Sequence, residues 1–197
     1  MRDAFGLFAR RPLAFTMMFV AFLFAALFVS LLPVLGGVLQ LMALPLLSLG
    51  FMIATRSALD DGPVRAMQFI EPLRGDPARR RSLLTLCALY GVAAIGILVL
   101  CDAISGGAMQ RLQALMASGN VPQAEVDALL DEPGVTAAAL TALVLGTLLS
   151  IPFWHAPALV HWGAQSVGQA LFSSTLAVWR SAAAMPKPKM TPNQAIA

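Results

Sequence analysis

The side chains with the clearest capacity for chemistry are two cysteines, two histidines and one glutamine, all set in apolar stretches. Cys87 and Cys101 stand fourteen positions apart, which is about 21 Å along a helix. A disulfide requires Cα atoms within about 7 Å of each other, so these two thiols do not pair. We expect inert thiols held in helix packing, with an intermolecular disulfide of Cys101 as the alternative.

The histidines do not have the spacing of a metal site. His155 and His161 are six residues apart, whereas two ligands stacked on one helix face are four apart, and no Cys or carboxylate stands near them in the sequence. Glycine-rich phosphate loops, zinc-ligand spacings and the G-x-S-x-G and H-E-x-x-H motifs are missing as well. The sequence therefore predicts no catalytic residue, no cofactor, no metal site and no enzyme.

The elements that hold these residues are long uncharged runs. Charged residues make up 12% of the 197 positions and hydrophobic residues 58%, whereas a soluble domain has about 25% charged residues. The run from Pro12 to Thr55 has 44 residues, which as one helix would be about 66 Å long, against a hydrocarbon core of about 30 Å. It therefore predicts two spans, 12–32 and 38–55, and the uncharged run 82–101 predicts a third.

The last uncharged run, Pro133 to Trp179, is long enough for two spans. Whether it holds one span or two is therefore decided from the distribution of basic residues. Lys and Arg favour the cytoplasmic side of a membrane, and a fourth span at 135–153 leaves Arg111 as the one basic residue outside. Polar residues are frequent after Pro152, among them His155, His161, Gln165 and several serines, so we expect 158–179 to be an amphipathic helix lying on the membrane. The predicted order is a cytoplasmic N-terminus (1–11), spans 12–32 and 38–55, a cytoplasmic loop with an amphipathic segment (56–81), span 82–101, a periplasmic helical hairpin (102–134), span 135–153, the interfacial helix 158–179 and a disordered cytoplasmic tail (180–197).

The fold class is thus an all-α, polytopic helical membrane protein with four transmembrane helices and a C-terminal interfacial amphipathic helix. Small residues recur every four positions along the fourth span, which lets another helix approach closely; that helix comes from the same chain or from a second copy. Gln40 is the candidate for a functional polar contact, with an interhelical hydrogen bond as the alternative. The small-residue set is Ala138, Ala142, Gly146 and Ser150, and the predicted headgroup or topology anchors are Arg10, Arg11, Arg79, Arg80 and Arg81.

One segment carries a family resemblance. The run Pro152-Phe153-Trp154-His155-Ala156-Pro157-Ala158-Leu159-Val160, followed by Ala170-Leu171-x-x-Ser174 and Arg180, resembles an uncharacterised family of polytopic bacterial inner-membrane proteins. Residues of the middle loop and the third span agree with it: Pro63, Phe69, Leu73, Arg74, Leu83, Leu84 and Tyr90. Members of that family usually have six spans, and the resemblance implies that this chain lacks the last two. The resemblance implies no activity.

Two functions remain open at this point. The first is a non-enzymatic scaffold or accessory component of a membrane assembly, located in the bacterial inner membrane with both termini cytoplasmic. The alternative is a small transporter or channel subunit whose copies surround a polar path near Gln40. The expected partners are the lipid bilayer and other membrane helices, including a homo-oligomer; nucleic acid is not expected, because the arginines are tied to the spans and mixed with acidic residues.

Overall fold

The computed structural model describes residues 12–32, 35–118 and 122–183, and in these ranges every regular element is a helix. The predicted all-α fold class is confirmed. The N-terminal segment with Arg10 and Arg11 and the C-terminal tail lie outside the described residues. The elements are α2 (Pro12–Ser30), α3 (Leu35–Leu59), η1 (Ala66–Phe69), α4 (Glu71–Arg74), α5 (Pro77–Ile104), α6 (Ala108–Ser118), α7 (Gln123–Leu130), α8 (Pro133–Phe153), α9 (Ala156–Gly163) and α10 (Val167–Ala183).

Within the described residues, four stretches of helix are long and apolar enough to cross a membrane: α2, α3, α5 and the joined pair α8–α9. Two of these helices, α3 and α5, continue past the uncharged runs into charged segments. α5 begins at Pro77 because Pro suits the first helical position and because the Asp76 carboxylate caps the helix, with Oδ1 accepting a hydrogen bond from the Ala78 N–H at 3.3 Å. The arginines at 79–81 therefore lie in the first turns of the helix and not in a preceding loop.

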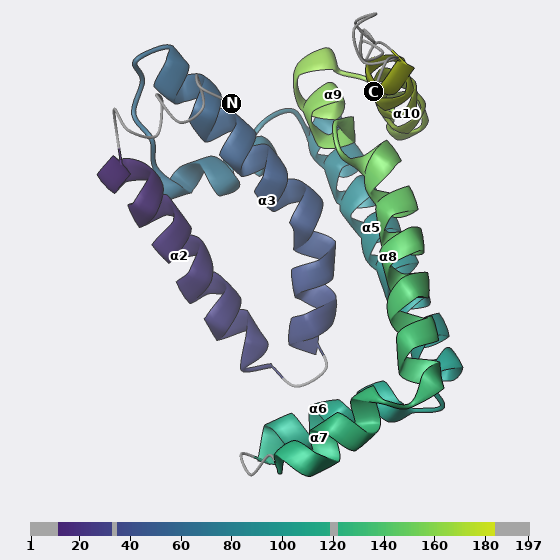
Figure 1. Ribbon diagram of the computed structural model, residues 1–197. Helices are drawn as coiled ribbons and strands as arrows, with labels where there is room; N and C mark the ends of the chain where they lie inside the picture. The colour runs from purple at the N-terminus through teal and green to yellow at the C-terminus, as the bar shows by residue number, and fades with distance from the viewer. Residues whose placement is uncertain (1–11, 33–34, 119–121, 184–197) are drawn as a thin grey trace, which may run out of the picture.

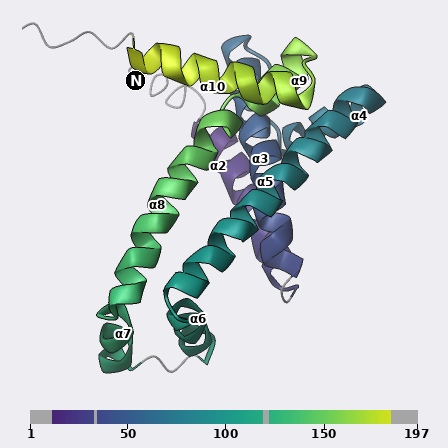
Figure 2. The ribbon, with the colours of Figure 1, turned by 90° about the vertical axis from the view of Figure 1, so that its right-hand side faces the viewer.

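The helices run alternately up and down (Figure 1). α2 and α3 form a hairpin, α5 packs against α3, and α8 runs beside α5 (Figure 2). Where α5 packs on α3, Gly91 leaves no room for a side chain, because an added Cβ would stand 3.4 Å from the Cα of Met42 and closer still to the Met42 side chain.

The connector between α3 and α5 enters the space between α2 and α3. The ring of Phe69 in η1 lies 5.1 Å from that of Phe51 and 6.5 Å from that of Phe22, measured between centroids. A Cβ on Gly50 would stand 3.0 Å from the Phe69 Cα. The sequence predicted an amphipathic segment lying on the membrane surface, whereas part of this segment is wedged between two spans, because an aromatic side chain gains more from burial against other rings than at the interface.

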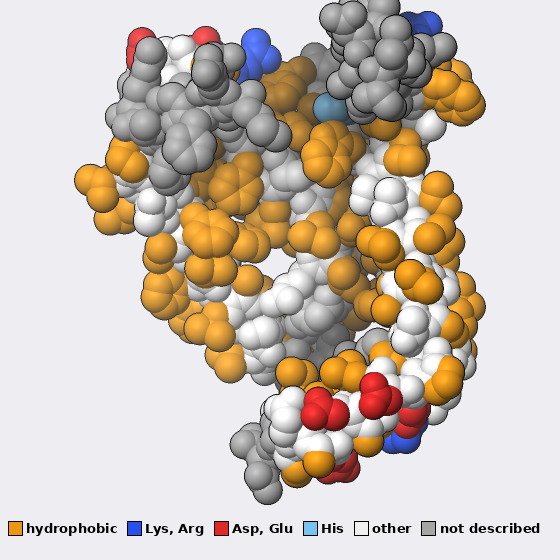
Figure 3. Space-filling model, in the orientation of Figure 1, with side chains coloured by type: hydrophobic (Ala, Val, Ile, Leu, Met, Phe, Trp, Pro, Cys, Tyr) orange, Lys and Arg blue, Asp and Glu red, His pale blue; other side chains and the backbone are white. Residues whose placement is uncertain are grey.

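The main hydrophobic core lies at one end of the molecule. We call it the arginine-rich end: it holds the C-terminus of α3, η1, α4, the N-terminus of α5, and α9 and α10, and its basic residues include Arg56, Arg65, Arg74, Arg79, Arg80, Arg81 and Arg180. Side chains from four helices meet there, namely Leu49, Ile53, Leu83, Leu86, Ala156, Val160 and Ala170. Between the two ends, the face in Figure 3 shows mainly apolar side chains, and the charged ones gather at both extremities.

The other end is closed by α6 and α7, which lie in the segment 102–134 where the sequence predicts a periplasmic helical hairpin. Ala108, Leu129 and Val135 make a small apolar cluster that holds this hairpin to the base of α8. A surface ion pair joins Arg111 to Glu132, with 3.0 Å between Nη2 and Oε2. The hairpin thus packs on the ends of α5 and α8.

The predicted interfacial helix 158–179 is two helices, α9 and α10. The break falls at Ala164, which adopts a left-handed conformation with φ 48°. The sequence signal for the new start is Ser166-x-x-Gln169, half of a capping box, and Gln169 Oε1 accepts a hydrogen bond from the Ser166 N–H at 3.3 Å. α10 then lies across the end of the bundle (Figure 2).

Candidate functional site

The residues that carry the family resemblance form a corner where α8, α9 and α10 meet. Its centre is Ser174, which has no exposed surface. Its Oγ accepts a hydrogen bond from the His155 N–H at 3.1 Å and donates one to the Ile151 carbonyl at 3.2 Å. In an uninterrupted helix these two backbone groups would bond to each other, so the hydroxyl of α10 is inserted into an opened turn of the α8–α9 helix. We call this arrangement the Ser174 bridge.

Pro157 stands just after this opened turn. Proline has no N–H to give to the carbonyl four residues earlier, and its ring clashes with that carbonyl, so an α-helix bends or breaks there. Ala156 and Ala170 are both fully buried, and their small side chains let α9 and α10 approach closely enough for the serine to reach the gap. The motif residues therefore fix an angle between helices.

A cavity of about 210 Å³ lies beside this corner, between the start of α5 and the turn from α9 to α10. We call it the Arg79 cavity; its lining includes Asp76, Arg79, Ser82, Ala164, Gln165 and Ser166. Around it, buried polar atoms without a hydrogen-bond partner in the described chain are Arg79 Nε, His161 Nδ1 and Gln165 Oε1. Polar atoms left unpaired inside a protein are costly, and three of the four such side-chain atoms among the described residues gather here.

The three predicted anchors of the middle loop are not equivalent. Arg79 is half-buried and lines the cavity, whereas Arg80 and Arg81 are exposed and lie along a separate groove on α5. The structure thus singles out one arginine of three. The predicted anchors Arg10 and Arg11 lie outside the described residues.

Gln40 makes the interhelical hydrogen bond that the sequence left open as the alternative. Its Nε2 donates to the carbonyl of Ala26 at 2.7 Å and joins α3 to α2. The hydroxyls of the spans mostly bond to their own helix, as expected for lipid-embedded Ser and Thr; those that do so are Ser30, Ser48, Thr85, Thr141, Thr147 and Ser150.

The small-residue face of α8 is only partly covered by its own chain. Ala138 is buried, and its carbonyl accepts a hydrogen bond from the Cys101 thiol with 3.5 Å between Sγ and O. At Gly146, an added Cβ would meet no atom within 4 Å. The expected close helix contact at Gly146 is therefore not made within the described chain, whereas Gly50 and Gly91 do make close contacts, because helix approach depends on where two axes cross.

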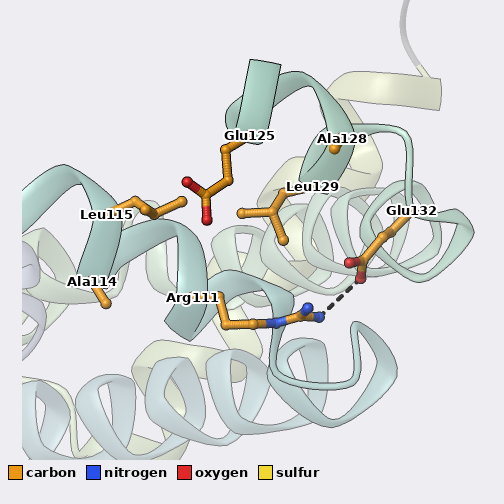
Figure 4. A pocket seen from close by; sticks show the side chains of 7 residues that line it. All are labelled: Arg111, Ala114, Leu115, Glu125, Ala128, Leu129 and Glu132. Atoms are coloured by element: carbon orange, nitrogen blue, oxygen red, sulfur yellow. Dashed lines mark hydrogen bonds and ion pairs between the residues drawn. The ribbon is translucent and has the colours of Figure 1, made fainter. Parts of the chain in front are cut away.

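A second hollow lies outside the spans, between α6 and α7 (Figure 4). It has a volume of about 550 Å³ and is lined by Leu115 and Leu129 on its apolar side. The carboxylate of Glu125 points into it, beside these leucines, while Arg111 and Glu132 pair at its edge. This groove offers an apolar floor and one negative charge to a ligand or partner.

The comparison with known proteins finds a membrane protein among the relatives of this chain. Over 183 residues the chain is 34% identical to a probable inner membrane protein of Burkholderia thailandensis. This chain is similar to an inner-membrane protein. Together with the apolar helices, the similarity identifies it as an integral membrane protein of helical class.

The similarity covers 91% of this chain and 66% of the inner-membrane protein, so the chain spans just under two thirds of its relative's length. The relative's name gives a location and no activity. No family profile and no solved structure matches the chain.

Sequence reasoning missed the Arg79 cavity. Asp76 and Arg79 are separated from Gln165 and Ser166 by more than eighty residues, and no motif joins them. The one available signal was Arg79 together with Ser82, which are three positions apart and hence on one face of a helix. The Ser174 bridge was easier to anticipate, since Ser174 and His155 both belong to the segment that carries the resemblance.

Proposed function

We propose that this chain is a four-span protein of the bacterial inner membrane that works as a non-enzymatic scaffold or accessory component of a membrane assembly. The observation that carries the proposal is the use of polar groups in the spans. The Gln40 amide is bonded to a neighbouring helix, and most hydroxyls are bonded to their own helices. The Gln40 bond joins two helices, and hydroxyls bonded to their own helix are used up locally, so neither offers a lining to a passing solute.

The open part of the α8 face supports assembly with a further helix. Small residues at a membrane-helix surface allow close packing where apolar burial supplies no driving force. A Cβ added to Gly146 would have no described atom within 4 Å. A helix from a second copy or another protein therefore has access to this position. Ala142, one turn earlier, is half-buried and extends the same face.

A transporter or channel subunit is the second candidate. This function requires Gln40 to line a polar path. Gln40 instead donates a hydrogen bond to the Ala26 carbonyl, which favours the scaffold over the transporter. Replacing Gln40 by Leu separates the two functions in reconstituted vesicles. Loss of solute flux with assembly intact would support transport, whereas the scaffold hypothesis expects no flux from either protein.

Assembly is tested by Gly146→Leu, with Gly96→Leu as the matched control. Both glycines lie in the middle of spans, and an added Cβ at either meets nothing within 4 Å, so both variants should fold. Association is measured by energy transfer between labelled copies in nanodiscs and by co-purification from native membranes. We expect Gly146→Leu to reduce association and Gly96→Leu to leave it unchanged; equal association of both variants would reject the α8 face as an assembly surface.

The proposed topology places the arginine-rich end and both termini in the cytoplasm and the α6–α7 hairpin in the periplasm. It rests on the positive-inside rule. Reporter enzymes fused after Asp102 and after Arg180 should report opposite compartments, and a common compartment would contradict the four-span arrangement. The six-span organisation that the resemblance implies for its members stays a prediction.

A further inference from the structure

We propose that the Arg79 cavity binds the headgroup of a phospholipid that carries both a phosphate and a primary amine, as phosphatidylethanolamine does. The cavity holds about 210 Å³, several times the volume of about 30 Å³ that one water occupies in the liquid. The proposal concerns a defined ligand site and does not depend on the scaffold function.

The first support is an unpaired cation. Arg79 lines the cavity, its Nε is buried without a partner, and its guanidinium makes no hydrogen bond or ion pair within the described residues. A guanidinium binds phosphate oxygens through two parallel N–H donors. The Ser82 side chain lines the same cavity, one turn further along α5, and its hydroxyl adds a donor for a phosphate oxygen.

The second support is a set of acceptors in the same cavity. Asp76 lines it and contributes a negative charge, of which Oδ1 already accepts from the Ala78 N–H. Gln165 adds a buried amide oxygen without a partner. A simple anion is opposed by the Asp76 charge, whereas a headgroup with a phosphate and a primary ammonium satisfies Arg79 and Asp76 together. A quaternary amine has no N–H to give to these acceptors, so the site should discriminate against it.

The third support is the position of the cavity at headgroup level. Ser82 is the first residue of the uncharged run of α5. All three tryptophans of the chain lie at this end, and they are exposed: Trp154, Trp162 and Trp179. Exposed tryptophans mark the membrane–water interface, and Trp162 also lies under the Arg56 guanidinium, 5.3 Å from its ring centroid.

The surface below the cavity suits an acyl chain. Leu89 follows Ser82 by seven residues, two helical turns, and therefore lies on the same face of α5. It is 46% exposed. An acyl chain that runs from a headgroup in the cavity along α5 thus reaches an exposed leucine, a contact that a free phosphate compound would not make.

The test uses the full chain purified in detergent and stripped of lipid. Native mass spectrometry measures binding of phosphatidylethanolamine, phosphatidylcholine and phosphatidylglycerol with identical acyl chains. We expect the ethanolamine lipid to bind best. Arg79→Gln should weaken its binding about tenfold, the loss expected for one charge-assisted phosphate contact. Arg80→Gln, the neighbouring exposed arginine, is the matched control and should have little effect.

Two further variants sharpen the result. Asp76→Asn should remove the preference for ethanolamine over choline, because the amine loses its charged acceptor. Arg79→Lys keeps the charge without the planar fork and should give intermediate binding, and it replaces Arg79→Gln if that variant does not fold. Equal losses at Arg79 and Arg80, or no preference for ethanolamine over choline in the parent protein, would overturn the proposal.

Free ligands distinguish a lipid from a soluble phosphate compound. O-phosphoethanolamine and inorganic phosphate are titrated into the protein in lipid-free micelles and followed by calorimetry. Weak or no binding of both is expected, because they lack the acyl chains that use the surface at Leu89. Binding of either as tightly as the intact lipid would show a site for a soluble phosphate compound and overturn the lipid assignment.

Discussion

Replacing Ser174 by Ala tests the corner on which the arginine-rich end is built. The hydroxyl bridges the His155 N–H and the Ile151 carbonyl and is fully buried. Alanine removes both hydrogen bonds and leaves both backbone groups shielded from water. A buried polar group without a partner costs about 1–3 kcal/mol. The two groups face each other across the opened turn and can partly recover by approaching, so we expect a net loss of about 2 kcal/mol.

That loss has a measurable size. In a chain of about 150–250 residues, each kcal/mol lowers the melting temperature by about 2–4 °C, so Ser174→Ala should melt about 4–8 °C below the parent protein. Melting is followed in detergent micelles by circular dichroism and by tryptophan fluorescence, since Trp154 is adjacent to the bridge. Hydrogen exchange of the His155 amide should also accelerate, because its acceptor is gone.

The matched control is Ser173→Ala on the same helix. Ser173 is half-buried, and its hydroxyl makes no hydrogen bond within the described part of the chain, so its loss should cost less than about 0.5 kcal/mol. If Ser174→Ala melted at the same temperature as Ser173→Ala and His155 kept its exchange protection, the bridge would not stabilise the corner and the reasoning would be refuted.

Three other substitutions follow from the packing. Gly91→Ala places a Cβ against Met42 and should cost about 1–3 kcal/mol, which unfolding in mixed micelles would detect; unchanged stability would show that α3 and α5 do not approach as described. Phe69→Ala removes the half-buried ring between α2 and α3 and should cost about 2 kcal/mol, with easier proteolysis of the connector; retained protection would contradict the wedge. Arg111→Ala breaks the exposed pair with Glu132 and should cost less than about 1 kcal/mol at low salt; a larger loss that persists in high salt would point to a buried role.

The sequence predicted that the helices lie in a lipid bilayer, and it predicted how many of them are long enough to cross it. Both depend on the lengths of uncharged runs, and such runs act locally, because a charge anywhere within a span is expensive in lipid. The helix ends were less well predicted, since α3 and α5 continue past the apolar runs into charged segments. The break at Ala164 was missed although Ser166 and Gln169 signalled a new helix start.

The candidate sites were also predicted only in part from the sequence. The sequence identified Gln40 as a polar side chain within a span and Arg79 as one of three adjacent arginines, because both depend only on residue type and local hydropathy. Which arginine is half-buried, which glycine meets a neighbouring helix and which serine fills an opened turn were decided by the crossing of helices. Ser174 reaches a carbonyl 23 positions earlier, and Arg79 meets the turn beyond α9, because α5, α9 and α10 pack together at one end of the bundle.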